Sequence, residues 1–269
     1  MKVYISADIE GIWGVVSKKQ VMSAGADYSR ARELMTTEVN LACEALLENG
    51  VTDITVNDSH GPMDNILIEN LNPNVQLISG SPKPLSMMQG IEKGYDKAMF
   101  IGYHSRAGSS RSNFDHTYHG GIISSIKLNG TSFGESGLNA RLAGYYSVPV
   151  VFVSGDKSLT EQVEEEIGSI TTLAVKESIN RTSAVNLSYS QLEQGYKDKI
   201  KEAVELNIEP LNPQGPYVIE VEFLTSQGAN LAPRIPTVTQ TGAKTIEIKS
   251  DDFLEIFKTL NAVISVAGK

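Results

Sequence analysis

Apolar residues occupy alternate positions from residue 3 to residue 9, which is the period of a strand with one buried face. Asp8 and Glu10 fall together on the other face of this expected strand, and Gly11 then lets the backbone turn. Two neighbouring carboxylates repel each other and are unfavourable to bury without a partner. A bound cation would relieve both effects, and an exposed edge strand with solvated acids is the alternative that this stretch leaves open.

Short apolar runs alternate with helical patterns along the first 175 residues. Strands are expected at residues 54–56, 75–78, 98–103, 122–128, 148–153 and 172–175, and helices at 28–49, 66–71, from 138 onward and at 159–167. This alternation is typical of a sheet with helices on its faces. The expected fold class is therefore α/β, with a mostly parallel or mixed central sheet flanked by helices.

A polar stretch between residues 179 and 192 suggests a junction in the chain. Beyond it the pattern predicts a helix at 191–206, strands at 217–224 and 245–248, and an amphipathic closing helix at 253–266. We expect two domains from this organisation. The first, residues 1–185, is an α/β metal-binding catalytic domain, and the second, residues 186–269, is a smaller α+β lobe that shapes the pocket or mediates oligomerisation.

Composition and charge narrow the class of protein. The hydrophobic share of 41% and charged share of 20% are those of an ordinary globular protein. The net charge of -9 argues against a nucleic-acid partner, because phosphate binding needs a basic face. The sequence has neither a membrane-spanning apolar run nor an N-terminal signal peptide pattern. The single cysteine, Cys43, is expected as a small buried side chain. These features predict a cytoplasmic protein that does not act at a membrane.

Side chains that bind metals follow three of the expected strands. Asp8 and Glu10 come at the end of the first strand, Asp58 and His60 after the second, and His104 after another. Ligands in parallel sheets bind beyond the carboxyl ends of the strands. We therefore expect these side chains to meet at one edge of the sheet.

The types of side chain in this group limit which metals they suit and which chemistry the site can perform. The chain has four histidines, which are His60, His104, His116 and His119. Imidazole and carboxylate ligands without cysteine suit zinc, manganese or iron at a reactive site better than a structural zinc. With Asp8, Glu10 and Glu135 the carboxylates exceed what one ion needs, which indicates two ions bridged by a shared acid. Two-metal sites activate a water and polarise the carbonyl that it attacks.

Other chemistries fit the sequence less well. It contains no dinucleotide-binding or phosphate-binding glycine loop and no nucleophile elbow. Asp58, Ser59 and His60 are residue types of a serine hydrolase, but neighbours on a strand point to opposite faces and cannot form a relay. A dinuclear phosphoesterase or another amidohydrolase stays an alternative, with Arg106 and Arg111 as candidate phosphate ligands. A metal-binding or assembly protein without activity is the non-enzymatic alternative.

Five short motifs follow one another along the first 180 residues. They are Ser6-Ala7-Asp8-Ile9-Glu10-Gly11, Asn57-Asp58-Ser59-His60, Gly102-Tyr103-His104-Ser105-Arg106-Ala107, Gly134-Glu135-Ser136-Gly137-Leu138-Asn139-Ala140 and Val175-Lys176. Together they resemble the successive motifs of the DppA-type D-aminopeptidases, the zinc metallopeptidases of family M55. The match of five motifs in order is more specific than any single short pattern.

This resemblance implies a dinuclear zinc aminopeptidase that hydrolyses short peptides with N-terminal D-amino acids, such as D-Ala-D-Ala. It implies that Asp8 bridges two zinc ions in each subunit. Glu10 and His60 would complete one zinc site, and His104 and Glu135 the other.

The resemblance also assigns a catalytic histidine and an assembly. His116 falls where the family has its remaining active-site histidine, and it would stabilise the oxyanion or transfer a proton to the leaving amine. His119, three residues further on, is the alternative for this role. The family forms a ring-like decamer, so a homo-oligomer, with a decameric ring as its form, is the implied assembly.

Overall fold

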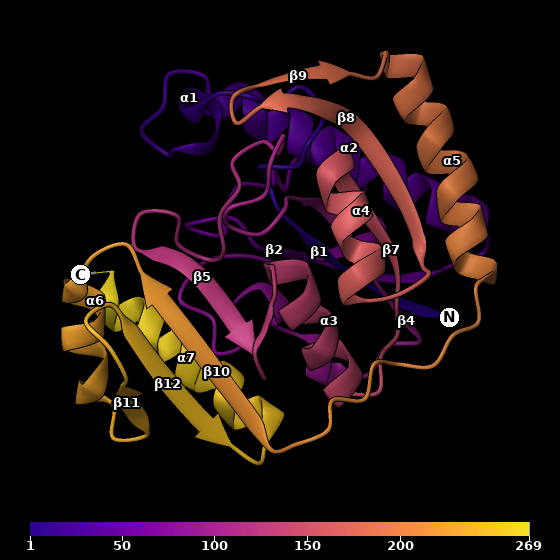
Figure 1. Ribbon diagram of the computed structural model, residues 1–269. Helices are drawn as coiled ribbons and strands as arrows, with labels where there is room; N and C mark the ends of the chain where they lie inside the picture. Colours follow the sequence, from indigo (N-terminus) through magenta and orange to yellow (C-terminus); the bar gives the residue numbers. More distant parts are fainter. Residues whose placement is uncertain (269) are drawn as a thin grey trace.

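The computed structural model describes residues 1–268 as two sheets with helices packed around them (Figure 1). The larger sheet has seven strands. Their spatial order is β3 (Val75–Ile78), β2 (Asp53–Asp58), β1 (Lys2–Ala7), β4 (Lys97–Tyr103), β7 (Val150–Asp156), β8 (Thr171–Asn180) and β9 (Ser183–Asn186). All neighbours pair in parallel except β8 and β9. The expected α/β class with a mostly parallel central sheet is therefore confirmed.

Helices cover both faces of this sheet. They are α1 (Lys18–Val21), α2 (Tyr28–Glu48), α3 (Glu135–Tyr145), α4 (Lys157–Glu166) and α5 (Tyr189–Glu205), with short 3-10 helices η1 (Ser86–Met88) and η2 (Ile91–Lys93). The apolar sides of α2 and α5 share one core with one face of the sheet. The other face shares a second core with α3, α4 and the second sheet. Cys43 of α2 is fully buried in the first core, as expected.

The second sheet is antiparallel and forms the smaller lobe (Figure 1). Its strands lie in the order β11 (Val238–Gln240), β12 (Thr245–Ser250), β10 (Tyr217–Phe223), β5 (Ile123–Leu128) and β6 (Thr131–Ser132). The lobe also contains α6 (Ser226–Leu231), η3 (Ala232–Arg234) and α7 (Phe253–Ala267). An α+β lobe at the C-terminus was expected, but its sheet also takes two strands from the middle of the chain.

Sheet membership does not follow the order of the chain. β5 and β6 precede residue 185 and yet belong to the second sheet, where β5 pairs with β10. α5 follows residue 185 and packs against α2 and β8 of the first sheet. The division into domains at residues 1–185 and 186–269 stays a prediction, and the two sheets exchange segments across it.

Two expected elements differ from the structure near the first strands. β1 ends at Ala7, so Asp8 and Glu10 lie in the turn after the strand rather than side by side on one of its faces. The turn is tight, because a side chain at Gly11 would lie only 1.8 Å from the carbonyl oxygen of Tyr103. The helix expected at residues 66–71 was wrong: only isolated hydrogen-bonded turns form there.

No helix within residues 1–268 combines the length and the apolar character that crossing a membrane requires.

A buried carboxylate between α2 and α5 makes stability depend on pH. Glu38 of α2 is 1% exposed and accepts hydrogen bonds from Trp13 N and from Tyr196 Oη of α5. Burial raises the pKa of Glu38 from 4.5 to about 7. Between these values the unfolded chain releases the proton while the folded protein retains it, so stability falls as the pH rises through this window.

Glu38→Gln is therefore expected to remove this pH dependence, because glutamine imitates the protonated side chain. The free energy of unfolding of the wild type, relative to the variant, should fall by about 3 kcal/mol between pH 4.5 and pH 7. Denaturant titrations of both proteins across this range measure the difference, in which other titrating groups cancel. Parallel curves would show that the pKa of Glu38 is the same in the folded and the unfolded protein.

Candidate active site

Six polar side chains meet where β1, β2 and β4 end and α3 begins. The turn after β1 carries Asp8 and Glu10, the segment after β2 carries His60, β4 is followed by His104, the loop beyond it carries His116, and Glu135 is the first residue of α3. The parallel sheet brings these segments together, because the carboxyl ends of its central strands share one edge. The structure thus places all six candidate residues in one cluster.

Asp8 lies between two histidines, with one carboxylate oxygen toward each. Its Oδ1 is 3.4 Å from His60 Nδ1, and its Oδ2 is 3.5 Å from His104 Nε2. Glu10 Oε2 lies 2.7 Å from His60 Nδ1, and Glu135 Oε1 lies 3.4 Å from His104 Nε2. The cluster therefore consists of two carboxylate–histidine pairs joined by one central aspartate.

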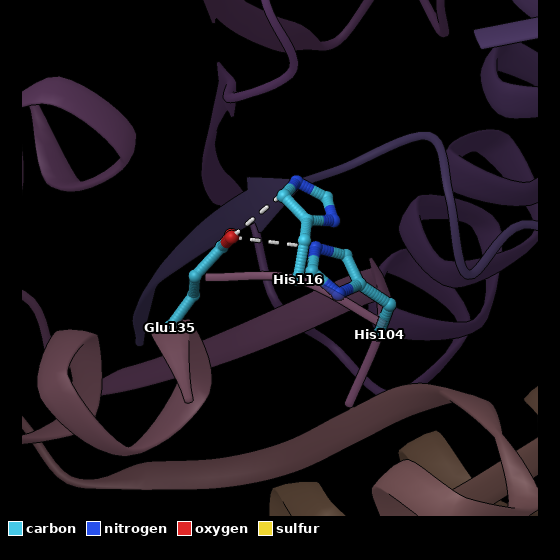
Figure 2. A group of neighbouring side chains, drawn as sticks. All are labelled: His104, His116 and Glu135. Atoms are coloured by element: carbon cyan, nitrogen blue, oxygen red, sulfur yellow. Dashed lines mark ion pairs between the residues drawn. The ribbon is translucent and has the colours of Figure 1, made fainter. Parts of the chain in front are cut away.

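His116 lies against His104 on the Glu135 side of the cluster (Figure 2). The two imidazole rings stack with centroids 4.1 Å apart and planes inclined by 9°. His116 Nε2 is 3.7 Å from Glu135 Oε1. The side chain of His116 is 18% exposed, whereas that of His104 is 1% exposed, so His116 is the more accessible of the two rings.

In each of His60, His104 and His116, one ring nitrogen points away from the cluster and contacts a backbone carbonyl oxygen. The contacts join His60 Nε2 to Val21 O (2.7 Å), His104 Nδ1 to Ser105 O (3.0 Å) and His116 Nδ1 to Phe114 O (2.7 Å). Because a carbonyl oxygen only accepts, the outer nitrogen of each ring carries a proton. In its neutral form, each ring then turns a lone pair toward the carboxylates, which is how metal-binding histidines are held.

The separations within the cluster fit zinc. Two ligand atoms, each ~2.0–2.1 Å from a tetrahedral zinc ion, lie about 3.3 Å apart. Of the four separations that join a carboxylate to His60 or His104, three are 3.4–3.5 Å, and the fourth, from Glu10 to His60, is 2.7 Å. Within the described residues, His104 Nε2 is buried without a hydrogen-bond partner, as expected for an atom whose partner is a cation. Ligand atoms of Asp8, Glu10 and His104 also lie close enough together to hold one ion.

The protonation equilibria of the protein without metal reflect the same crowding of negative charge. Burial and the neighbouring Glu10 raise the pKa of Asp8 to about 7. Burial disfavours the charged ring of His104, but Glu135 and Asp8 outweigh this effect and raise its pKa to about 10. Burial and the adjacent His104 lower the pKa of His116. The site therefore attracts positive charge, while the His116 ring favours its neutral form.

A cavity of about 170 Å³ opens onto the cluster. Its lining comprises Asp8, Glu10, His60, His116 and Glu135 together with Ser59, Gly61, Met63, Ser86, Met87 and Tyr118. Arg106 and Arg111 line a different cavity, of about 380 Å³, and Arg106 pairs with Glu166 at 3.1 Å. Among the described residues, neither arginine lines the cavity of the cluster, which removes the main support for a phosphoesterase.

Two residues at the edge of the sheet lie outside the cluster. Asp58 is the last residue of β2, and its carboxylate accepts hydrogen bonds from Asn65 Nδ2 and Ile66 N, both at 2.7 Å. It fixes the segment after His60 and does not contact the other acids. His119 is exposed, and its Nδ1 accepts a hydrogen bond from Gly121 N.

Supporting contacts hold the ligands, and the sequence predicted none of these contacts, although Lys176 belongs to one of the five motifs. Lys176 of β8 is 2% exposed, and its ammonium group donates to the carbonyl oxygens of Glu10, Ile12 and Val15 at 2.6–2.9 Å. These bonds secure the turn that carries Glu10. Tyr118 N donates to Glu135 Oε1 at 2.6 Å and fixes that carboxylate. In the sequence, the one sign of these contacts is a lysine, Lys176, at the end of an otherwise apolar strand.

The fold and the site define a metal-dependent hydrolase with an α/β core. The model of the family Peptidase_M55, D-aminopeptidase, matches residues 1–262. The chain is 36% identical over 272 residues to a D-aminopeptidase of Bacillus subtilis (strain 168), which covers 99% of this chain and 98% of the relative. The chain therefore belongs to the M55 D-aminopeptidase family, as the five motifs indicated.

A solved structure is similar over the whole chain. It is the Zn-dependent D-aminopeptidase DppA from Bacillus subtilis, described as a self-compartmentalizing protease. The TM-score is 0.96 at 35% sequence identity, and the match covers 100% of this chain and 98% of the other. The likeness thus extends through the C-terminal lobe, beyond the residues that carry the motifs.

Proposed function

We propose that this protein is a dinuclear zinc aminopeptidase that hydrolyses short peptides with an N-terminal D-amino acid. The observation that carries the proposal is the position of Asp8, whose two oxygens face His60 and His104 separately. Such a carboxylate suits the shared ligand of two ions. The family membership and the D-aminopeptidase relatives support the reaction class.

The ligand assignment follows from the two pairs. Asp8 would bridge two zinc ions, with Glu10 and His60 completing one site and His104 and Glu135 the other. When bound, the pair of ions would lower the pKa of a water toward neutrality and polarise the peptide carbonyl. The carbonyl oxygens of Val21 and Ser105 would keep the rings of His60 and His104 in the tautomer that this binding needs.

His116 would move the proton during catalysis. Its Nδ1 proton is held by Phe114 O, so Nε2 faces the cluster with a free lone pair. A neutral ring in this orientation accepts a proton at Nε2 and later donates it to the leaving amine. The tautomer therefore favours proton transfer over direct stabilisation of the oxyanion, which would need a proton already on Nε2.

The oligomeric state, the partners and the cellular location are further proposals. The similar solved structure is described as self-compartmentalizing, which supports a homo-oligomer for this chain, with a decameric ring as the specific form. Analytical ultracentrifugation gives the number of copies, and a monomer would contradict the proposal. The net charge of -9 supports a protein without nucleic-acid partners, and a cytoplasmic location, which cell fractionation tests, stays a prediction.

Chelator-sensitive hydrolysis of D-Ala-D-Ala is the expected result for the zinc-loaded protein, with L-Ala-L-Ala as the comparison. Loss of cleavage after chelation and its return with zinc would tie the activity to the cluster. Cleavage of the L-peptide alone would keep the metal chemistry and reject the stereochemistry. A zinc-loaded protein that cleaves neither peptide but hydrolyses phosphoesters would replace the proposal with the alternative function.

A further inference from the structure

The cavity of the site has two chemically different walls. One wall consists of Asp8, Glu10, His60, Glu135 and His116, which are the acidic residues and histidines of the lining. The other comes mainly from the segment between β2 and β4, which contributes Met63 and Met87. Both methionines are buried, with 8% and 3% of their surface exposed.

Most polar groups on the second wall already form hydrogen bonds within the protein. The Ser59 hydroxyl lies 2.7 Å from the Ser6 hydroxyl and donates to the carbonyl oxygen of Met87 at 3.1 Å. The Tyr118 hydroxyl donates to Asn139 Oδ1 at 3.0 Å. Besides the acids and imidazoles, a substrate in this cavity therefore meets the two thioether residues Met63 and Met87, next to which an apolar side chain binds best.

The backbone holds the methionine wall rigidly in place. Met63 has φ 59° and Ser86 has φ 49°, which are left-handed values that residues with side chains adopt only when surrounding contacts enforce them. Met63 N donates to His60 O at 2.7 Å. The carbonyl oxygen of Met87 accepts hydrogen bonds from the side chains of Tyr4, Ser6, Asn57 and Ser59. The wall is thus poorly able to retreat before a larger ligand.

The space that remains is small. A cavity of about 170 Å³ lies well below the ~300–1,000 Å³ of sites for drug-sized ligands. It has to hold the N-terminal residue of the peptide and the bond to be cleaved. We infer that Met63 and Met87 are specificity-determining residues, which limit the N-terminal residue of the substrate to a small side chain. This inference rests on the proposed function.

Met63→Ala and Met87→Ala, each tested separately, should relax this limit. The measurement is kcat/KM for D-Ala-D-Ala, D-Leu-D-Ala and D-Phe-D-Ala on the same zinc-loaded preparation, so that the ratio of two values is independent of the folded fraction. We expect the D-Leu to D-Ala ratio to rise at least tenfold, because a methylene in an apolar pocket changes selectivity by roughly 10–200-fold. Met63→Cys and Met87→Cys remove less volume and serve if an alanine variant does not fold.

Met88→Ala is the matched control, because Met88 is the fully buried neighbour of Met87 in η1 and does not line the cavity. Its selectivity ratio should equal that of the wild type. An unchanged ratio in variants of both methionines, or an equal rise in the control, would overturn the inference while D-peptide hydrolysis persists. A wild-type protein that cleaves no D-peptide would instead overturn the proposed function, and the inference with it.

Discussion

Asp8→Asn is expected to lower kcat/KM for D-Ala-D-Ala by at least about a thousandfold, because metal ions supply several kcal/mol of charge stabilisation in such reactions. The zinc content should fall below two ions per subunit at the same time. Among the described residues, Asp8 is the one carboxylate whose oxygens face both His60 and His104, so its replacement affects both proposed zinc sites. Activity assays and elemental analysis of the purified variant measure the two effects together.

The matched control for this variant is Asp58→Asn. Asp58 is also a buried carboxylate at the end of a neighbouring strand, but it bonds to Asn65 and Ile66 instead of facing the cluster. It should keep its zinc and most of its turnover and lose some stability. Two zinc ions retained by Asp8→Asn would contradict the bridging role.

His116→Ala is expected to reduce turnover about 10²–10⁴-fold, the usual contribution of a positioned acid–base group. Zinc content should not change, because the proposed ligands of both ions lie on other residues. Steady-state kinetics with D-Ala-D-Ala and zinc analysis of the same sample test the two statements. The position of His116 beside His104 and Glu135 makes the second measurement essential, because these three side chains could themselves hold an ion.

His119→Ala provides the comparison for this second variant. His119 is exposed and outside the cavity lining, so its loss should leave turnover unchanged. If zinc were lost from His116→Ala, His116 would be a ligand rather than a proton carrier. Undiminished turnover would assign the proton transfer to water or to His119.

The sequence predicts the site well because parallel strands collect their carboxyl ends at one edge. Apolar runs located β1, β2 and β4, and the polar residues that follow them, Asp8, His60 and His104, meet in the structure. Local pattern could not distinguish Asp8 from Asp58, because both carboxylates come at the end of an apolar run. Only their neighbours in space decide which carboxylate faces the cluster.

Long-range contacts are what the sequence pattern could not predict. Lys176 looks like the polar end of a strand, but its partners at Glu10, Ile12 and Val15 lie more than 160 residues earlier in the chain. Met63 and Met87, which form the methionine wall, lie on either side of residues 66–71, where the pattern predicted a helix that does not form. In both cases tertiary hydrogen bonds, rather than local preference, determine the backbone.

The second sheet combines strands from distant parts of the chain, and this determines when the sheet can be completed during synthesis. β5 ends at Leu128, and its partner β10 begins only at Tyr217. At ~5–20 residues per second, the ribosome needs roughly 4–18 s to make the intervening chain. During this interval β1, β2 and β4 already exist and can pair, whereas β5 presents its apolar residues and an open edge without its partner. The second lobe therefore closes last, and the nascent chain is most vulnerable to aggregation before β10 emerges.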